Sequence, residues 1–248
     1  MNVQNIVVAG KSGAGKQPRV DVLVQAYGLR QLATGNIFRE YLGTFNKVRA
    51  SAKTDGLWSE AGFAADAAML GFKAAQYVDR GRFVPDEITN ALLAAAFRAG
   101  NGKGFVLDGY PRTPDQSDFL LKLAKDCGTR IDLVLMVDNE DEAIVARTIG
   151  RRVCPNKTCA KVFHLQFKPP TADGKCTACG TPVVLRSDDS EEKIRTRLAE
   201  FQSKALPAIK RLSAAGIPTV SVPGNLPVFT DEAVKQSVLD VVQPALKG

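Results

Sequence analysis

The strongest constraint on the fold is an alternation of short apolar runs with longer amphipathic segments. Two of the runs, residues 106–107 and 133–137, are apolar at every position. Strands of this kind are typical of a parallel sheet whose two faces are both covered by helices. The pattern predicts strands at residues 5–10, 29–33, 104–108, 131–138 and 218–222. It therefore predicts an α/β fold, built on a doubly wound five-stranded parallel sheet.

Helical periodicity fills the intervals between these strands. It predicts helices at residues 16–27, 61–79, 86–99, 115–125, 140–151, 190–214 and 231–246. Asp189 and Glu192 have capping-box spacing at the start of one of them. Two stretches interrupt the alternation, one long and helical and one rich in Pro, Gly and Cys. We interpret residues 33–84 and 150–189 as insertions into a core formed by residues 1–32, 85–149 and 190–248.

Composition excludes some classes of protein and leaves the ligand open. No apolar run approaches the ~18–20 residues that span a bilayer, and the N-terminus lacks the pattern of a secretory signal. We therefore expect a cytoplasmic protein without a membrane partner. The net charge of +7 suits nucleic acid, an acidic membrane or a small anion. Because the arginines stand singly within short motifs, the pattern favours a polyphosphate pocket.

A glycine-rich segment joins the first predicted strand to the first predicted helix. Gly10, Gly15 and Lys16 satisfy the Gly-x4-Gly-Lys spacing of a phosphate-binding loop. Glycines let backbone N–H groups turn toward phosphate oxygens, and the helix N-terminus and the lysine add positive charge. The loop ends in Gln17-Pro18, without the usual hydroxyl residue and with one backbone donor removed. We predict that phosphate binding survives and that catalysis is slowed.

A carboxylate and an arginine follow the third predicted strand. Asp108 ends an apolar run at the edge where α/β sheets bind ligands, and it could hold water around Mg²⁺. Arg112 comes one turn later and suits fork-like contact with phosphate oxygens. Taken alone, the run has an alternative interpretation as a strand end closed by a Gly–Pro turn with a surface arginine.

Four of the five cysteines gather in one short stretch. Cys154 and Cys159 form a Cys-x4-Cys pair, and Cys176 and Cys179 form a Cys-x2-Cys pair. Two such pairs on turns can place four thiolates tetrahedrally around Zn²⁺. Such a zinc would be structural, because four protein ligands leave no open position. Four reduced thiols and two disulfides are the alternatives.

Six segments occur in the order in which adenylate kinases carry them. They are residues 10–17, 33–39, 83–87, 107–113, 150–154 and 186–189. The chain thus resembles the adenylate kinase family over nearly its whole length. The resemblance implies a P-loop kinase that transfers a phosphoryl group reversibly between ATP, with Mg²⁺, and AMP. It also implies a nucleoside-monophosphate-binding insertion at 33–84, a zinc-ribbon-like lid at 150–189 and a monomer without a nucleic-acid partner.

The resemblance also implies roles for individual residues. Those implied in phosphoryl transfer are Lys16, Asp108, Arg112, Arg151, Arg186 and Arg197. Those implied in ATP binding are Gly10, Ser12, Gly13, Ala14, Gly15, Lys16, Gln17, Arg147, Arg151 and Asn225. Those implied in AMP binding are Thr34, Arg39, Val84, Gly109, Arg112, Gln116, Arg186 and Arg197. Zinc is implied on Cys154, Cys159, Cys176 and Cys179.

Three features depart from the family pattern. Asn36 stands where the family usually has Asp, the segment after Arg39 is longer than usual, and the phosphate loop ends in Gln17-Pro18. The Gln17 side chain could itself donate an N–H to the phosphates, which would make the ending a neutral variant. Otherwise Gln17-Pro18 and Asn36 support an alternative to the kinase, a nucleotide-binding sensor that has lost most of its activity.

Two further alternatives concern the ligand. The first is another nucleotide pair, such as GTP with AMP, because base choice rests on few contacts. The second is a zinc-ribbon nucleic-acid binder, which the positive charge and the four cysteines would suit. The aromatic–basic interleaving that a strand-binding surface needs is missing, which weakens the second alternative.

Overall fold

The computed structural model describes residues 3–35, 37–38, 73–74, 77, 84–156, 158–159, 161–185 and 189–247. Two site residues named from the sequence, Arg39 and Arg186, lie outside this part of the chain, and so does Asn36, which departs from the family pattern. The long segment after Arg39 and most of the helix predicted at 61–79 lie outside it as well.

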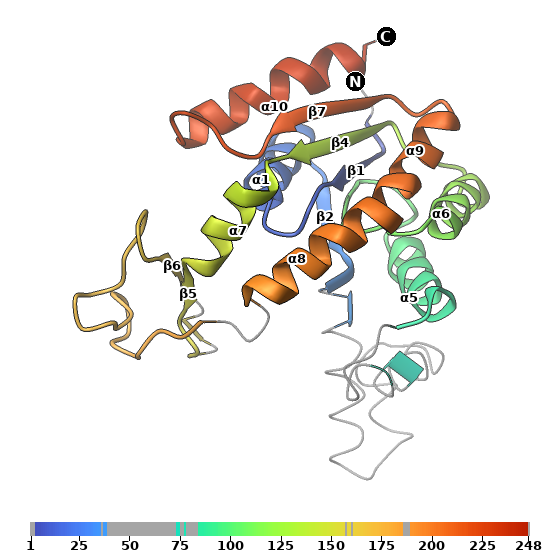
Figure 1. Ribbon diagram of the computed structural model, residues 1–248. Coiled ribbons are helices and arrows are strands. Elements are labelled where there is room, and N and C mark those ends of the chain that lie inside the picture. Colours follow the sequence, from blue (N-terminus) through green and yellow to red (C-terminus); the bar gives the residue numbers. More distant parts are fainter. Residues whose placement is uncertain are drawn as a thin grey trace.

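Within the described residues, five strands form the central sheet and two more form a small separate one (Figure 1). The central strands are β1 (Asn5–Ala9), β2 (Arg30–Ala33), β3 (Phe105–Asp108), β4 (Leu133–Asp138) and β7 (Thr219–Pro223). The separate pair is β5 (Arg151–Val153) with β6 (Val162–His164), which run antiparallel. Each central strand lies within two residues of its predicted bounds.

Helices connect the strands. They are α1 (Lys16–Tyr27), α5 (Asp86–Ala99), α6 (Pro114–Asp126), α7 (Asp141–Ile149), α8 (Glu191–Glu200), α9 (Leu206–Ala214) and α10 (Asp231–Ala245). A short π-helical segment, η1 (Phe201–Ala205), joins α8 to α9. None of the helices in the described part of the chain is long and apolar enough to cross a membrane.

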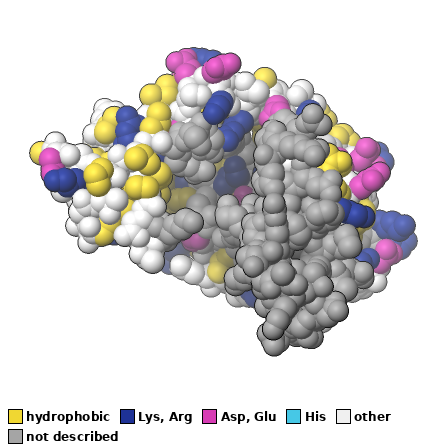
Figure 2. All heavy atoms as spheres, turned by 90° about the horizontal axis from the view of Figure 1, so that it is seen from below, with side chains coloured by type: hydrophobic (Ala, Val, Ile, Leu, Met, Phe, Trp, Pro, Cys, Tyr) yellow, Lys and Arg dark blue, Asp and Glu magenta, His cyan; other side chains and the backbone are white. Residues whose placement is uncertain are grey.

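The central sheet is parallel throughout, with strand order β2-β3-β1-β4-β7. The prediction of a doubly wound five-stranded parallel sheet is therefore confirmed. In the central sheet the connection after β1 leads to β2 at one edge, and the connection after β4 leads to β7 at the other edge. The loops that leave β1 and β4 therefore run toward opposite edges of the sheet. Ligands bind at such a reversal of strand order, outside the carboxyl ends of the strands. Figure 2 shows a hollow on the lower face of the molecule, with Lys and Arg side chains around it.

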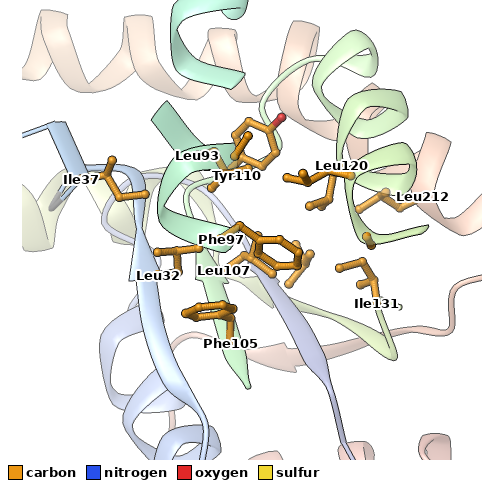
Figure 3. Close-up of a cluster of buried hydrophobic side chains, with 14 of the residues drawn as sticks. Leu32, Ile37, Leu93, Phe97, Phe105, Leu107, Tyr110, Leu120, Ile131 and Leu212 are labelled. Atoms are coloured by element: carbon orange, nitrogen blue, oxygen red, sulfur yellow. The ribbon is translucent and has the colours of Figure 1, made fainter. Parts of the chain in front are cut away.

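The side chains of β1 alternate between two apolar cores. Val7 belongs to one core and Ile6 and Val8 belong to the other, and all are at most 1% exposed. The first core, drawn in Figure 3, packs the sheet against α5, α6 and α9 through Leu93, Phe97, Leu120 and Leu212. The second packs it against α1, α7, α8 and α10 through Leu23, Ile144, Leu198 and Val238. Covering on both faces explains why these strands are continuously apolar.

The helix predicted at residues 190–214 is interrupted by η1. Pro207 stands at the second position of α9, where it cannot donate a backbone hydrogen bond. Just before it, the Leu206 N–H bonds to the Phe201 carbonyl, five residues back instead of four. The wider turn accommodates the proline while the helix axis continues, which is a recognised cause of π-type bulges and bends.

The core assignment predicts a large effect of truncating Phe97. Phe97 is 0% exposed and its ring centroid lies 5.4 Å from that of Phe105. Phe97→Ala should lower the free energy of unfolding by about 3–5 kcal/mol, because a cavity replaces a buried ring. Phe167→Ala is the matched control, since Phe167 is 72% exposed. Urea unfolding measures both, and a loss below about 1 kcal/mol for Phe97→Ala would contradict the packing described.

Candidate active site

The phosphate loop follows β1 and begins α1. Gly15, with φ 95°, precedes the helix, and a Cβ there would lie 2.8 Å from the Gly224 carbonyl oxygen. A Cβ on Gly10 would collide with the Val137 carbonyl oxygen. Lys16 Nζ donates to the carbonyls of Gly10 and Lys11, at 2.9 Å each. The loop therefore curls around the ammonium group that the motif supplies for phosphate.

Gln17 and Pro18, at the end of the loop, lie in the first turn of α1. Pro18 is the third residue of α1, still within the turn whose N–H groups have no partner inside the helix. It costs the helix no bond but leaves one donor fewer for a ligand. The Gln17 amide hydrogens go to Asp21 Oδ1 at 2.9 Å and Gln31 Oε1 at 3.1 Å. Gln17 thus points to neighbouring side chains, and its N–H groups are engaged there.

Charged side chains from four segments converge beside the loop. Desolvation lowers the pKa of Lys16, an effect that Asp108 opposes and Arg112 reinforces. Desolvation also lowers the pKa of Arg112, while Asp108 and Glu200 raise it and Arg197 lowers it. These mutual effects place the loop, the end of β3, the following turn and α8 around one site. Lys16, Asp108, Arg112 and Arg197 are thus brought together.

Thr34, Gly109 and Arg112 meet on the β2–β3 side of this cluster. The buried Thr34 hydroxyl donates to the Gly109 carbonyl at 3.2 Å, and Arg112 Nε donates to the same oxygen at 2.8 Å. A Cβ on Gly109, whose φ is 76°, would lie 3.1 Å from both Thr34 Oγ1 and Arg112 Nη2. Glycine here keeps the two side chains close to each other.

Gln116 supports the backbone of Arg112. Its Oε1 accepts from the Arg112 N–H at 2.7 Å and its Nε2 donates to Asp86 Oδ1 at 2.8 Å. Thr113 Oγ1 donates to the other oxygen of Asp86 and also caps α6. Val84, just before α5, packs against the adjoining apolar core. Asp86 was missed as a site residue, although it lies in the family segment 83–87 and at the start of a predicted helix.

Two arginines hold the end of β7 and the loop after it: Arg147 from α7 and Arg19 from α1. Arg147 Nη2 donates to Asn225 Oδ1 at 2.8 Å. Arg19, fully buried, donates from Nη1 to the Gly15 carbonyl at 3.2 Å and from Nη2 to the Pro223 carbonyl at 2.8 Å. Sequence reasoning missed Arg19, although an arginine beside apolar neighbours on α1 is unusual enough to mark it.

Arg151 and Asp189 form a bidentate ion pair at the two ends of the segment 150–189. Arg151 Nε donates to Asp189 Oδ2 at 2.7 Å and Nη2 donates to Oδ1 at 2.6 Å. The Asp189 side chain is completely buried. The predicted capping box is therefore wrong: Ser190 is the N-cap of α8, without a side-chain bond. A fork-like pair with a guanidinium is a stronger interaction for a buried carboxylate than a helix cap.

The four clustered cysteines have the geometry of a metal site, named here the cysteine knuckle: Cys154, Cys159, Cys176 and Cys179. Their Sγ atoms all lie within 4.8 Å of one another. The Cys154–Cys179 and Cys159–Cys176 separations are 3.4 and 3.6 Å. Tetrahedral zinc with bonds of about 2.3 Å needs sulfur separations of about 3.8 Å, whereas a disulfide needs ~2.05 Å. The thiol set therefore fits structural zinc, as the sequence predicted.

Comparison with known proteins agrees with this arrangement. A family model described as adenylate kinase matches residues 61–217. The adenylate kinase of Streptomyces griseus is 37% identical over 93% of this chain and 95% of its own. That of Symbiobacterium thermophilum is 35% identical over 86% and 88%, and that of Acholeplasma laidlawii is 31% identical over 96% and 97%. Because the family model covers more than half of the chain and these relatives align over most of their length, the chain belongs to the adenylate kinase family.

Proposed function

We propose that this chain transfers a phosphoryl group reversibly from ATP to AMP, giving two ADP. The observation that carries the proposal is the convergence of Lys16, Asp108, Arg112 and Arg197 between the phosphate loop and the Thr34 side of the sheet. Phosphoryl transfer depends on positioning and on neutralising charge at the transferring group, more than on covalent chemistry. Family membership and the names of the relatives support the same reaction.

In this proposal the loop backbone and Lys16 hold the ATP phosphates, and Arg147, tied to Asn225, lies beside the base. The loop residues assigned to ATP are Gly10, Ser12, Gly13, Ala14 and Gly15. The AMP phosphate meets Arg112, which the carbonyl of Gly109 orients. Arg39 and Arg186 are assigned to the phosphates by the family resemblance. Bound with ATP, Mg²⁺ would neutralise phosphate charge, and the Asp108 carboxylate suits water of its shell.

The proposal also divides the chain into working parts. Residues 1–32, 85–149 and 190–248 form the core, 33–84 the AMP-binding insertion and 150–189 the lid. Arg151 supports this division, because its pair with Asp189 joins the two ends of the lid. We propose a cytoplasmic monomer, because the family resemblance implies a monomer and the four knuckle cysteines suit a reducing compartment.

One observation favours a slow kinase over an ordinary one. Pro18 removes a donor from the turn that faces the phosphates, and no hydroxyl replaces the one usual beside Lys16. Binding of both nucleotides with low turnover is therefore the second candidate function. A coupled assay for ADP with ATP–AMP, GTP–AMP and other pairs tests both the reaction and its base specificity.

Removing Arg112 should abolish most activity. Arg112→Ala is expected to lower kcat/KM by several orders of magnitude while leaving the melting temperature nearly unchanged, because the guanidinium acts on the transferring group. Arg211→Ala is the matched control, since Arg211 makes an exposed fork with Asp118 away from the cluster. An Arg112→Ala enzyme within about threefold of the parent would exclude Arg112 from the site, since that is under ~1 kcal/mol.

The knuckle should bind zinc as isolated. Metal analysis should find about one zinc ion per chain, and Cys176→Ser should lose it and lower the melting temperature without unfolding the sheet, because the metal staples only residues 150–189. Cys127→Ser is the control: Cys127 packs beside the apolar core, remote from the knuckle in sequence. Protein that contains no zinc, with thiols free or oxidised, would contradict the assignment.

Restoring a donor at the loop should speed turnover. Pro18→Thr, with Gln17 kept, returns a backbone N–H and places a hydroxyl two residues after Lys16. Since one transition-state donor is typically worth roughly 10²–10³ in rate, we expect kcat to rise at least tenfold with a smaller change in nucleotide affinity. Pro114→Thr at the start of α6 is the control. If kcat stays at the parent value, the Gln17-Pro18 ending is a neutral variant.

A further inference from the structure

Two glutamines form a closed amide pair beside the phosphate loop. Gln17 Nε2 donates to Gln31 Oε1 at 3.1 Å, and Gln31 Nε2 donates back to Gln17 Oε1 at 3.1 Å. Gln17 Nε2 also donates to Asp21 Oδ1 at 2.9 Å, and Gln31 Nε2 also donates to Asp108 Oδ2 at 3.0 Å. Each amide thus uses both of its hydrogens and its carbonyl oxygen. The four side chains form one linear hydrogen-bond network, with the Asp21 carboxylate at one end and the Asp108 carboxylate at the other.

The two ends of this network lie in different surroundings. The Asp21 end is exposed on α1, where a single amide–carboxylate bond contributes little. The Asp108 end is partly buried between β2 and β3, where a bond to an ionised acceptor is stronger and more sensitive to geometry. Of these hydrogen bonds, the one from Gln31 to Asp108 is therefore expected to matter most for function.

We propose that Gln31, held in place by Gln17, is a positioning residue for the Asp108 carboxylate. This inference rests on the role proposed above for Asp108 in holding water of the Mg²⁺ shell. The terminal torsion of an aspartate is broad, so a carboxylate at a strand end is not fixed by its backbone. A donor on Oδ2 sets the plane of the carboxylate and leaves Oδ1 to face the cleft. Gln17 restrains Gln31 by occupying its remaining hydrogen and its carbonyl oxygen.

The Gln17–Gln31 pair also suggests a role for Gln17 at the unusual end of the phosphate loop. Gln17 directly follows Lys16, where the general phosphate-loop motif has a hydroxyl residue. In this chain that position reaches Asp108 through Gln31 instead. Side-chain hydrogen bonds thereby connect the first turn of α1 to the Asp108 carboxylate at the end of β3.

The experiment replaces each glutamine by methionine, which has similar length and no donor. Gln31→Met should reduce the preference for the Mg²⁺ complex of a non-hydrolysable ATP analogue over the metal-free analogue by roughly five- to tenfold, as measured by calorimetric titration. In assays it should raise the Mg²⁺ concentration for half-maximal rate and lower kcat, with KM for AMP unchanged. Gln236→Met is the matched control, because Gln236 bonds to Asp240 on α10.

The contribution of Gln17 is tested by a double-mutant cycle. Gln17→Met should shift the Mg²⁺ preference in the same direction by a smaller factor, and adding it to Gln31→Met should cause no further loss. Independent, additive effects would overturn the proposed coupling. Because Gln17 is exposed, its variant keeps the test available if Gln31→Met fails to fold.

The variant Asp108→Asn distinguishes a failure of the positioning role of Gln31 from a failure of the proposed Mg²⁺ role of Asp108. If Asp108→Asn leaves the Mg²⁺ preference unchanged, the role of Asp108 itself is wrong. If Asp108→Asn reduces the preference and Gln31→Met does not, Asp108 keeps its role and the positioning by Gln31 is overturned. A reduction in both variants, with the Gln236→Met control at the parent value, supports the inference.

Discussion

Burial of β1 on both faces is the constraint from which the rest of the site follows. Val7 packs into one core and Ile6 and Val8 into the other, so the strand can neither slide nor turn over without exposing apolar surface. The glycine-rich loop that leaves β1 is therefore delivered to a fixed point between β3 and β4. The position of Lys16, and hence of the phosphate that we propose it binds, is set by the apolar packing of β1.

The site itself is an excess of positive charge held in place by a few carboxylates. Asp108 and Glu200 favour the charged form of Arg112, while Arg197 opposes it, and Asp189 holds Arg151 in a fork. Like charges brought this close repel one another when the cleft holds only water. A polyphosphate bound as proposed would relieve that repulsion, so the charge arrangement supports the proposed nucleotide site.

The sheet could be predicted from the sequence because continuous apolar runs carry their own signal, and all five strands were found within two residues. The four cysteines and the Lys16–Asp108–Arg112 cluster were predicted because their spacing is tied to chemistry. Local side-chain partners were not predictable: Asp189 prefers Arg151 to a helix cap, and η1 depends on Pro207. The Gln17–Gln31 pair joins residues on separate elements, and periodicity holds no information about such pairs.

The ion pair between Arg151 and Asp189 has an evolutionary consequence. It brings together two residues that are 38 positions apart. The segment between them therefore starts and ends at the same place on the core. An excursion closed at its base can lengthen, shorten or change its metal ligands without altering the sheet, because the entropy of closing a loop grows only slowly with its length. Selection can therefore exchange the cysteine knuckle as a module, whereas loss of Arg151 alone would leave the buried Asp189 carboxylate without its guanidinium.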